Sequence, residues 1–200
     1  MNPWRTPILL ALTILMGCSG SPPRRLFVLN TPSDAAPGVV DEAGRPTIEL
    51  RPVLVPDYLD TTEILVREGR NELKPLTAGG WGERLSVGMT AALGAALSQR
   101  LPDLRVTLSA GRTPARQILI DVESFDIWPD GRCVLTAQWT ILDKNRQTVG
   151  ASQRGVFVAA SVRSTDGAAD AANIVSGMGR AIDQLAVGVA FSVRRMSSGR

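Results

Sequence analysis

The chain of 200 residues contains no histidine, which removes the commonest general base and the commonest ligand of transition metals. A Ser-His-Asp triad is therefore impossible. The sequence also lacks a Gly-x-Ser-x-Gly elbow, a Walker loop and a Gly-x-Gly-x-x-Gly motif after a predicted strand. We therefore identify no catalytic, cofactor-binding or metal-binding residues, and we expect the protein not to be an enzyme.

Two pairs of acidic residues come nearest to a catalytic motif. Asp57 and Asp60 fall in a predicted turn, and Asp121 and Glu123 share one face of a predicted strand. Paired carboxylates can hydrolyse glycosides. Non-catalytic acidic residues in turns and on solvent-exposed strand faces are far commoner than catalytic pairs. Strand alternation points the second pair toward solvent. We interpret both pairs as surface residues.

Long apolar runs are missing except for one stretch near the start, over residues 8–16. It is shorter than the roughly 20 residues that a membrane span needs. A positively charged start, a short apolar core and a small residue before a cleavage site predict an export signal. The pattern Leu15-Met16-Gly17-Cys18 resembles a bacterial lipobox. The alternative is an ordinary secretory signal that happens to contain a cysteine.

The lipobox resemblance implies cleavage before Cys18, attachment of diacylglycerol to its sulfur and acylation of the new amino terminus. Each buried methylene contributes about 0.8 kcal/mol, so two or more chains hold a protein stably on a membrane. Lipoproteins retained in the inner membrane typically carry Asp after the cysteine, whereas this chain carries Ser19. The resemblance thus implies a lipid anchor on the periplasmic face of the outer membrane.

Cysteine is scarce, since Cys18 and Cys133 are the only two. If Cys18 carries lipid, no internal disulfide can form. Cys133 lies in an apolar strand pattern and is expected to be a small core residue. The formal net charge of +3 is mild and does not call for a nucleic-acid partner.

Aromatic residues make up only 4% of the chain. Trp81 and Trp139 are expected in the core. Trp128 ends a predicted strand beside a proline, where core packing and a role as an exposed contact anchor are both open.

The pattern of apolar residues predicts three parts: a signal peptide at 1–17, a lipidated tether with a short strand and a loop at 18–46, and an α+β domain at 47–196. Spacings of three and four residues predict helices over 85–101 and from 166 or 170 to 194. Gly79-Gly80-Trp81-Gly82 is interpreted as the entry to the first helix. Apolar runs and turn residues predict strands over 26–29, 48–55, 63–67, 72–76, 104–109, 117–128, 132–143 and 148–160. We expect a mostly antiparallel sheet with two helices packed on one face.

Three motifs stand within residues 51–85: the turn Pro56-Asp57-Tyr58-Leu59-Asp60, the strand Ile64-Leu65-Val66-Arg67 and the helix start Trp81-Gly82-Glu83-Arg84-Leu85. Together with the lipobox they resemble the ABC-type transport auxiliary lipoprotein family, the PqiC-like group.

That resemblance implies a non-catalytic subunit of a system that moves lipids between the inner and outer membranes. It implies two kinds of partner, an MCE-domain protein and inner-membrane transporter components, and a homo-oligomer that matches a ring of the MCE protein. Two other functions stay open: a periplasmic lipid-binding shuttle, and a structural lipoprotein that grips an outer-membrane barrel.

The candidate contact residues are Pro56, Tyr58, Leu59 and Asp60, with Trp128 as a further anchor. A turn bounded by proline that carries an aromatic and an aliphatic side chain loses little entropy when it docks. The alternative is that Tyr58 and Leu59 fold back over the edge of the sheet and that Asp60 caps a turn.

Overall fold

The computed structural model describes residues 24–29, 44–108, 114–160 and 170–198. The expected signal peptide, Cys18 and most of the expected tether lie outside these residues. The described chain is an α+β fold of two helices and two mixed, mostly antiparallel sheets, which confirms the predicted fold class.

The larger sheet has five strands in the order β5-β2-β6-β7-β8. Its centre is an antiparallel meander of β6 (Arg116–Ile127), β7 (Arg132–Asp143) and β8 (Gln153–Ala160). The predicted turn between β6 and β7 is present, and Gly131 adopts the positive φ of 86° that such a turn favours. At the other edge, β2 (Thr47–Leu50) runs parallel to both β5 (Arg105–Thr107) and β6.

The smaller sheet has three strands in the order β1-β4-β3. β3 (Glu63–Arg67) and β4 (Leu73–Trp81) form an antiparallel hairpin, and β1 (Arg25–Phe27) joins β4 in parallel. Gly79 and Trp81 therefore belong to β4, not to the entry of a helix as predicted. A Cβ on Gly79 would lie 2.9 Å from the Phe27 ring and 3.0 Å from the Ala171 Cβ, so glycine permits this close approach.

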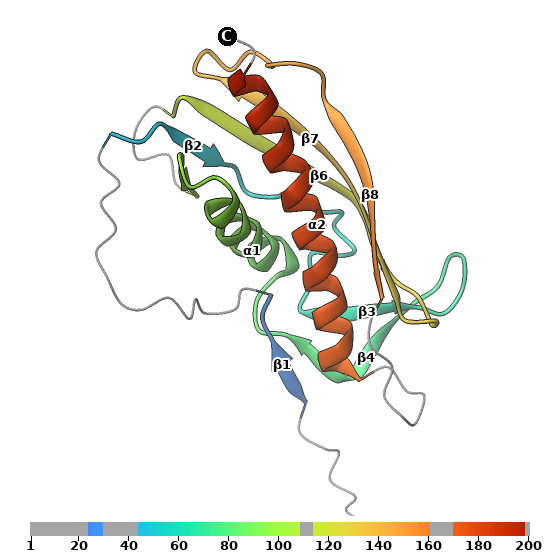
Figure 1. The fold of residues 1–200 in the computed structure, drawn as a ribbon. Coiled ribbons are helices and arrows are strands. Elements are labelled where there is room, and N and C mark those ends of the chain that lie inside the picture. Colours follow the sequence, from blue (N-terminus) through green and yellow to red (C-terminus); the bar gives the residue numbers. More distant parts are fainter. Residues whose placement is uncertain (1–23, 30–43, 109–113, 161–169, 199–200) are drawn as a thin grey trace, which may run out of the picture.

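The two helices, α1 (Leu85–Arg100) and α2 (Ala171–Ser198), pack side by side. α2 runs along the five-stranded sheet and contacts β7 and β8 (Figure 1). One face of the sheet therefore meets the helices, and the opposite face, which we call the outer face, carries the alternate residues of each strand.

The core fills the layer between the helices and the sheet. A bulge between Val122 and Ser124 shifts the alternation of β6, so that Ile120 before it and Phe125 after it both point inward. The core positions predicted for Cys133 and Trp139 are confirmed, and the Trp139 indole donates a hydrogen bond to Ser192 Oγ at 3.1 Å. By length and composition α2 could cross a membrane, but half of its apolar window is buried against this core.

Candidate functional site

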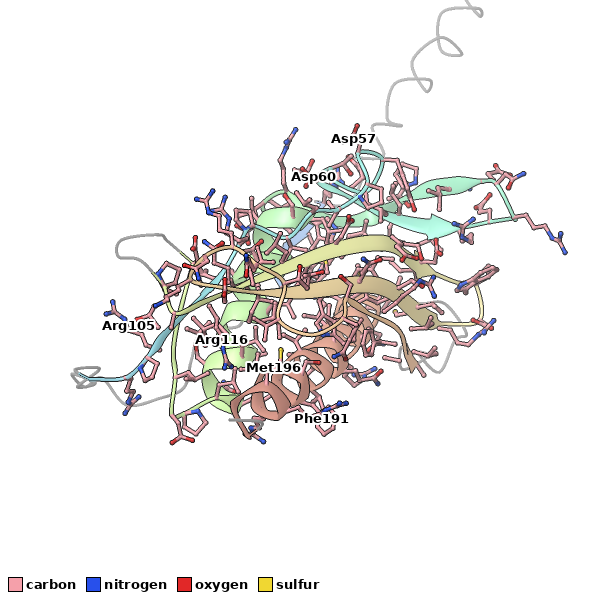
Figure 2. The ribbon with its side chains drawn as sticks, turned by 90° about the horizontal axis from the view of Figure 1, so that it is seen from above. Asp57, Asp60, Arg105, Arg116, Phe191 and Met196 are labelled. Carbon is pink, nitrogen blue, oxygen red and sulfur yellow. The ribbon has the colours of Figure 1, made fainter. Side chains whose placement is uncertain are left out.

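The turn Pro56–Asp60 lies on the side of the molecule away from the exposed face of α2, as the labels for Asp57, Asp60 and Phe191 show (Figure 2). Its backbone is closed by hydrogen bonds from the amides of Leu59 and Asp60 to the carbonyl of Pro56, at 2.9 and 3.2 Å. The turn is therefore a folded unit that presents its side chains in fixed directions.

The turn divides its side chains between the core and the surface. Leu59 is 5% exposed and belongs to the core, so it does not offer the contact surface that we predicted for it. Tyr58, the residue before it, is 44% exposed. Successive residues of a turn point in different directions, so one neighbour is buried and the other faces solvent.

Asp60 caps α1 from a distance in sequence. Its Oδ1 accepts a hydrogen bond from the backbone amide of Ser86 at 3.1 Å, and its Oδ2 lies 3.4 Å from Arg84 Nη1. The first turn of α1 contains no acidic residue, so Asp60 supplies the oxygen acceptor and the negative charge that a helix start favours. The alternative interpretation of Asp60, as a capping residue, therefore agrees with the structure. The element that it caps is the helix α1 and not a turn.

Replacing Asp60 with alanine should lower the free energy of unfolding by about 1 kcal/mol, the usual loss when a cap is removed. Asp57→Ala is the matched control, because Asp57 belongs to the same turn and is exposed. Urea unfolding of the two variants makes the comparison, and equal stabilities would contradict the capping role.

Arg67 and Asp126 form an ion pair whose charges act on Tyr58 of this turn. Both Nε and Nη2 of Arg67 donate to Asp126 Oδ1, at 2.9 and 2.6 Å. The two side chains are only 17% and 13% exposed. Arg67 Nη1 also donates to the carbonyl of Arg70 at 2.6 Å. The pair therefore ties the end of β3 to the end of β6.

Two guanidinium groups lie against the ring of Trp128. The Arg67 Cζ is 5.6 Å from the centroid of the Trp128 ring, and the Arg132 Cζ is 5.7 Å from it. Arg132 is held in turn by Asp130, at 2.6 Å. Cations over an indole face are attracted by the ring and limit its motion. We call Tyr58, Arg67, Asp126, Trp128 and Arg132 the aromatic–arginine cluster.

Tyr58 belongs to this cluster through its electrostatics. Partial burial and the negative charge of Asp126 raise the pKa of Tyr58 above its ordinary value of 10.0, while the positive charge of Arg67 opposes the rise. Two of the predicted contact residues are thus related to one ion pair: Trp128 contacts Arg67, and Tyr58 lies within electrostatic range of both charges. Pro56 is partly buried at the start of the turn.

The phenol of Tyr58 can be titrated alone, because the chain contains a single tyrosine. We expect its pKa, measured from tyrosinate absorbance, to lie above 10. Asp126→Asn should lower the pKa because it removes a negative charge that disfavours the phenolate, and Arg67→Gln should raise it because it removes a stabilising cation. Shifts in the opposite directions would contradict the arrangement.

The acidic pair Asp121 and Glu123 is exposed as predicted. Arg154 donates to Glu123 at 2.6 Å, and this hydrogen bond lowers the pKa of Glu123. In the described residues no group of three or more acidic or cysteine side chains could hold a metal ion. Burial raises the pKa of Cys133 to about 11, so its thiol stays protonated and unreactive.

Arg67 and Asp126 are the residues of this site that sequence reasoning missed. They stand 59 positions apart, and no spacing rule connects residues on two different sheets. The available signal was an arginine at the end of an apolar strand, as the last residue of the motif Ile64-Leu65-Val66-Arg67.

Two mixed sheets that pack with a pair of helices in this order define a class of α+β domain found in lipoproteins of the DUF330 type. The chain belongs to the ABC-type transport auxiliary lipoprotein component family, whose model matches residues 27–190. The protein is therefore a membrane-anchored auxiliary lipoprotein of an ABC-type transport system, with transporter proteins as its partners, and its family is generally non-catalytic.

Solved structures share this fold at low sequence identity. A DUF330 protein from Xanthomonas campestris is 17% identical, with a TM-score of 0.65 over 87% of this chain and 95% of its own. An uncharacterized protein is also 17% identical, with a TM-score of 0.65 over 74% of this chain and 92% of its own. Identity this low shows the fold alone. No curated protein matches the chain.

Proposed function

We propose that this lipoprotein anchors a periplasmic MCE-domain assembly to the outer membrane in an intermembrane lipid transport system. Its parts would be the signal peptide 1–17, the lipidated segment 18–46 with the anchor on Cys18, and the domain 47–196. The anchor would fix one end of the bridge, and a contact surface on the domain would hold the partner.

The aromatic–arginine cluster is the observation that carries this proposal. Trp, Tyr and Arg are the residues that contribute most to protein interfaces. Here their positions are set in advance by the Arg67–Asp126 pair and by the two guanidinium groups over Trp128. A surface ordered before binding loses little entropy when it docks. Such a surface suits a docking protein better than an enzyme.

Two alternatives are less well supported. A shuttle that encloses an acyl chain between its helices and sheet would need space there, whereas core side chains such as Met89, Leu93 and Ile182 fill that layer. A structural lipoprotein that grips a barrel would use an exposed surface equally well, so experiment must separate it from the anchor.

A photo-crosslinking residue placed at Trp128 or Tyr58 in cells tests the proposal. We expect the MCE-domain protein to be captured from both positions. A crosslinker at Val187 is the control, because this residue is 53% exposed on α2 and lies outside the cluster. Capture of a barrel protein without any MCE-domain protein would favour the structural alternative and overturn the anchor.

A further inference from the structure

The strand β1 begins close in sequence to the expected lipid anchor. Arg24 is the first residue that the structure describes, and it stands six positions after Cys18. Six residues of fully extended chain span about 20 Å at most. With lipid on Cys18, the start of β1 is therefore held within about 20 Å of the membrane.

Two ion pairs fasten β1 to the domain. Arg24 Nη1 and Nη2 donate to the two carboxylate oxygens of Glu63 on β3, at 3.1 and 2.5 Å. Arg25 Nη1 lies 3.6 Å from Asp170 Oδ1, one residue before the start of α2. An exposed ion pair contributes little alone, but these two act together with the pairing of β1 to β4. The link between the domain and Cys18 is therefore the short segment before Arg24.

β1 and the residue after it carry two aliphatic side chains that are more than half exposed. Leu26 is 68% exposed and Val28 is 55% exposed. They stand two positions apart in extended chain, so they point to the same side. On β4, Gly80 pairs with Leu26, and a Cβ on Gly82 would lie 3.3 Å from Val28 Cγ1. Glycine has no side chain that could shield these aliphatic groups. We call Leu26 and Val28 the β1 face.

The β1 face lies at one end of the long axis of the fold. β1 lies beside the start of α2, and the C-terminal end of α2 lies at the opposite end (Figure 1). The 28 residues of α2 make a helix about 42 Å long. Phe191, which is 61% exposed, belongs to the last third of this helix. The β1 face and Phe191 are therefore well separated, and the β1 face is the one that lies next to the link to Cys18.

The membrane is the occupant that this placement selects for the β1 face. The link before Arg24 is at most about half as long as α2, so it keeps this end of the domain near the lipid surface. Apolar side chains at that surface gain free energy when the boundary between headgroups and acyl chains covers them. Both arginines of β1 are paired with a carboxylate, so this end carries no net negative charge that anionic headgroups would repel. A protein partner would have to enter the narrow space between this end and the membrane.

We propose that the β1 face rests on the membrane that holds the Cys18 anchor, with Leu26 and Val28 at the boundary between headgroups and acyl chains. The ion pairs of β1 then orient the domain, so that α2 starts near the membrane and its C-terminal end points away from it. This orientation rests on the proposed anchor at Cys18. The segment 18–46 then does not act as one long tether, because it is attached to the domain at β1.

Spin labels test which face meets the membrane. The mature lipoprotein with Cys133→Ala has no free thiol once Cys18 carries lipid, so a single cysteine can be labelled in each of four variants, Leu26→Cys, Val28→Cys, Val156→Cys and Phe191→Cys. The proteins are reconstituted in vesicles of phosphatidylethanolamine and phosphatidylglycerol. We expect labels at 26 and 28 to collide with membrane-dissolved oxygen and to be shielded from a water-soluble nickel chelate. Labels at 156 and 191, which replace side chains that are 54% and 61% exposed, should show the reverse.

Energy transfer to a fluorescent lipid tests the direction of α2. Ser176 and Phe191 are both exposed on this helix, fifteen residues apart. A fluorophore at Phe191→Cys should lie about 20 Å farther from the vesicle surface than one at Ser176→Cys, because fifteen residues of helix rise about 22 Å.

Charge reversal tests the role of the ion pairs. Glu63→Lys together with Asp170→Lys places a positive charge against each arginine of β1, so the strand should detach. The next attachment is then β2, and the difference in distance between positions 176 and 191 should disappear. Glu68→Lys together with Glu72→Lys is the matched control. It makes the same change of charge at two exposed positions of the hairpin of β3 and β4, leaves β1 attached and should keep the difference.

Several results would overturn the proposal. Labels at 26 and 28 that are as accessible to the nickel chelate as the label at 156 would show that the β1 face does not touch the membrane. A label at 191 as shielded as the label at 26 would show that the domain lies on α2. Shielding at 26 and 28 that persists in Cys18→Ala protein without vesicles would show that another copy of the chain covers the β1 face.

Mass spectrometry separates these results from a failure of the anchor. Absence of lipid on Cys18 would overturn the anchor and the orientation together, whereas lipid on Cys18 with an accessible β1 face would overturn the orientation alone. A distance difference that survives in a folded Glu63→Lys, Asp170→Lys protein would show that the ion pairs do not orient the domain. The spin-label comparison keeps both ion pairs, so it decides the question even if this variant fails to fold.

Discussion

Replacing Cys18 with alanine should release the protein from the membrane and abolish the incorporation of labelled palmitate. An anchor of two or more acyl chains buries many methylenes at about 0.8 kcal/mol each, so its loss removes a strong hold on the membrane. To avoid retention by an uncleaved signal, the variant is exported behind an ordinary secretory signal. Fractionation of the envelope then measures the distribution.

The second cysteine provides the control for this result. Cys133 is fully buried in β7, and burial raises its pKa to about 11, so its thiol is neither accessible nor ionised. Cys133→Ala should therefore keep both the label and the membrane location. Loss of label in Cys133→Ala, or its retention in Cys18→Ala, would contradict the assignment of the anchor.

The expected anchor can be predicted from a local sequence pattern, whereas the proposed contact surface depends on contacts between segments that are distant in the sequence. The pattern around Cys18 is local, because a signal is read as a linear segment. The strands β3 and β7 also have local patterns, and they were predicted with the bounds that the structure has, Glu63–Arg67 and Arg132–Asp143. Each has a continuous apolar pattern with turn residues at its ends, and these signals need no knowledge of distant segments.

The division of the strands into two sheets could not be predicted in this way. β1 pairs with β4 over a separation of more than 50 residues, and β2 pairs in parallel with two later strands. Short strands carry too few residues to specify a neighbour, so the pairing is decided by packing. The glycines at positions 79, 80 and 82 are the local feature that marks the close approach of β1 to β4, because a Cβ on each would come close to the segment that contains β1.

The candidate site could be predicted only in part, for the same reason. Tyr58 and Trp128 were each identified from their own surroundings, in a turn and at the end of a strand. Their proximity depends on the contact between β3 and β6, and so does the partly buried Arg67–Asp126 pair. Leu59 was misjudged because a turn has no periodicity that separates an inward side chain from an outward one.

The Arg67–Asp126 pair should therefore control both the stability of the protein and the proposed contact surface. Asp126→Ala leaves a guanidinium that is 17% exposed without its carboxylate. Breaking a fully buried pair costs about 3–5 kcal/mol, and we expect about 2–3 kcal/mol here because water reaches part of the group. Urea unfolding measures this loss, and crosslinking from Trp128 should weaken with it.

A double-mutant cycle isolates the interaction from other effects of the substitutions. Arg67→Met in the Asp126→Ala background should cost less than Arg67→Met alone, because the double variant leaves no uncompensated charge. The exposed pair Glu123–Arg154 has the same 2.6 Å separation, but solvent screens it, so Glu123→Ala should destabilise the protein clearly less than Asp126→Ala. Simple additivity in the cycle, or equal losses at the two pairs, would show that the Arg67–Asp126 pair does not hold the cluster together.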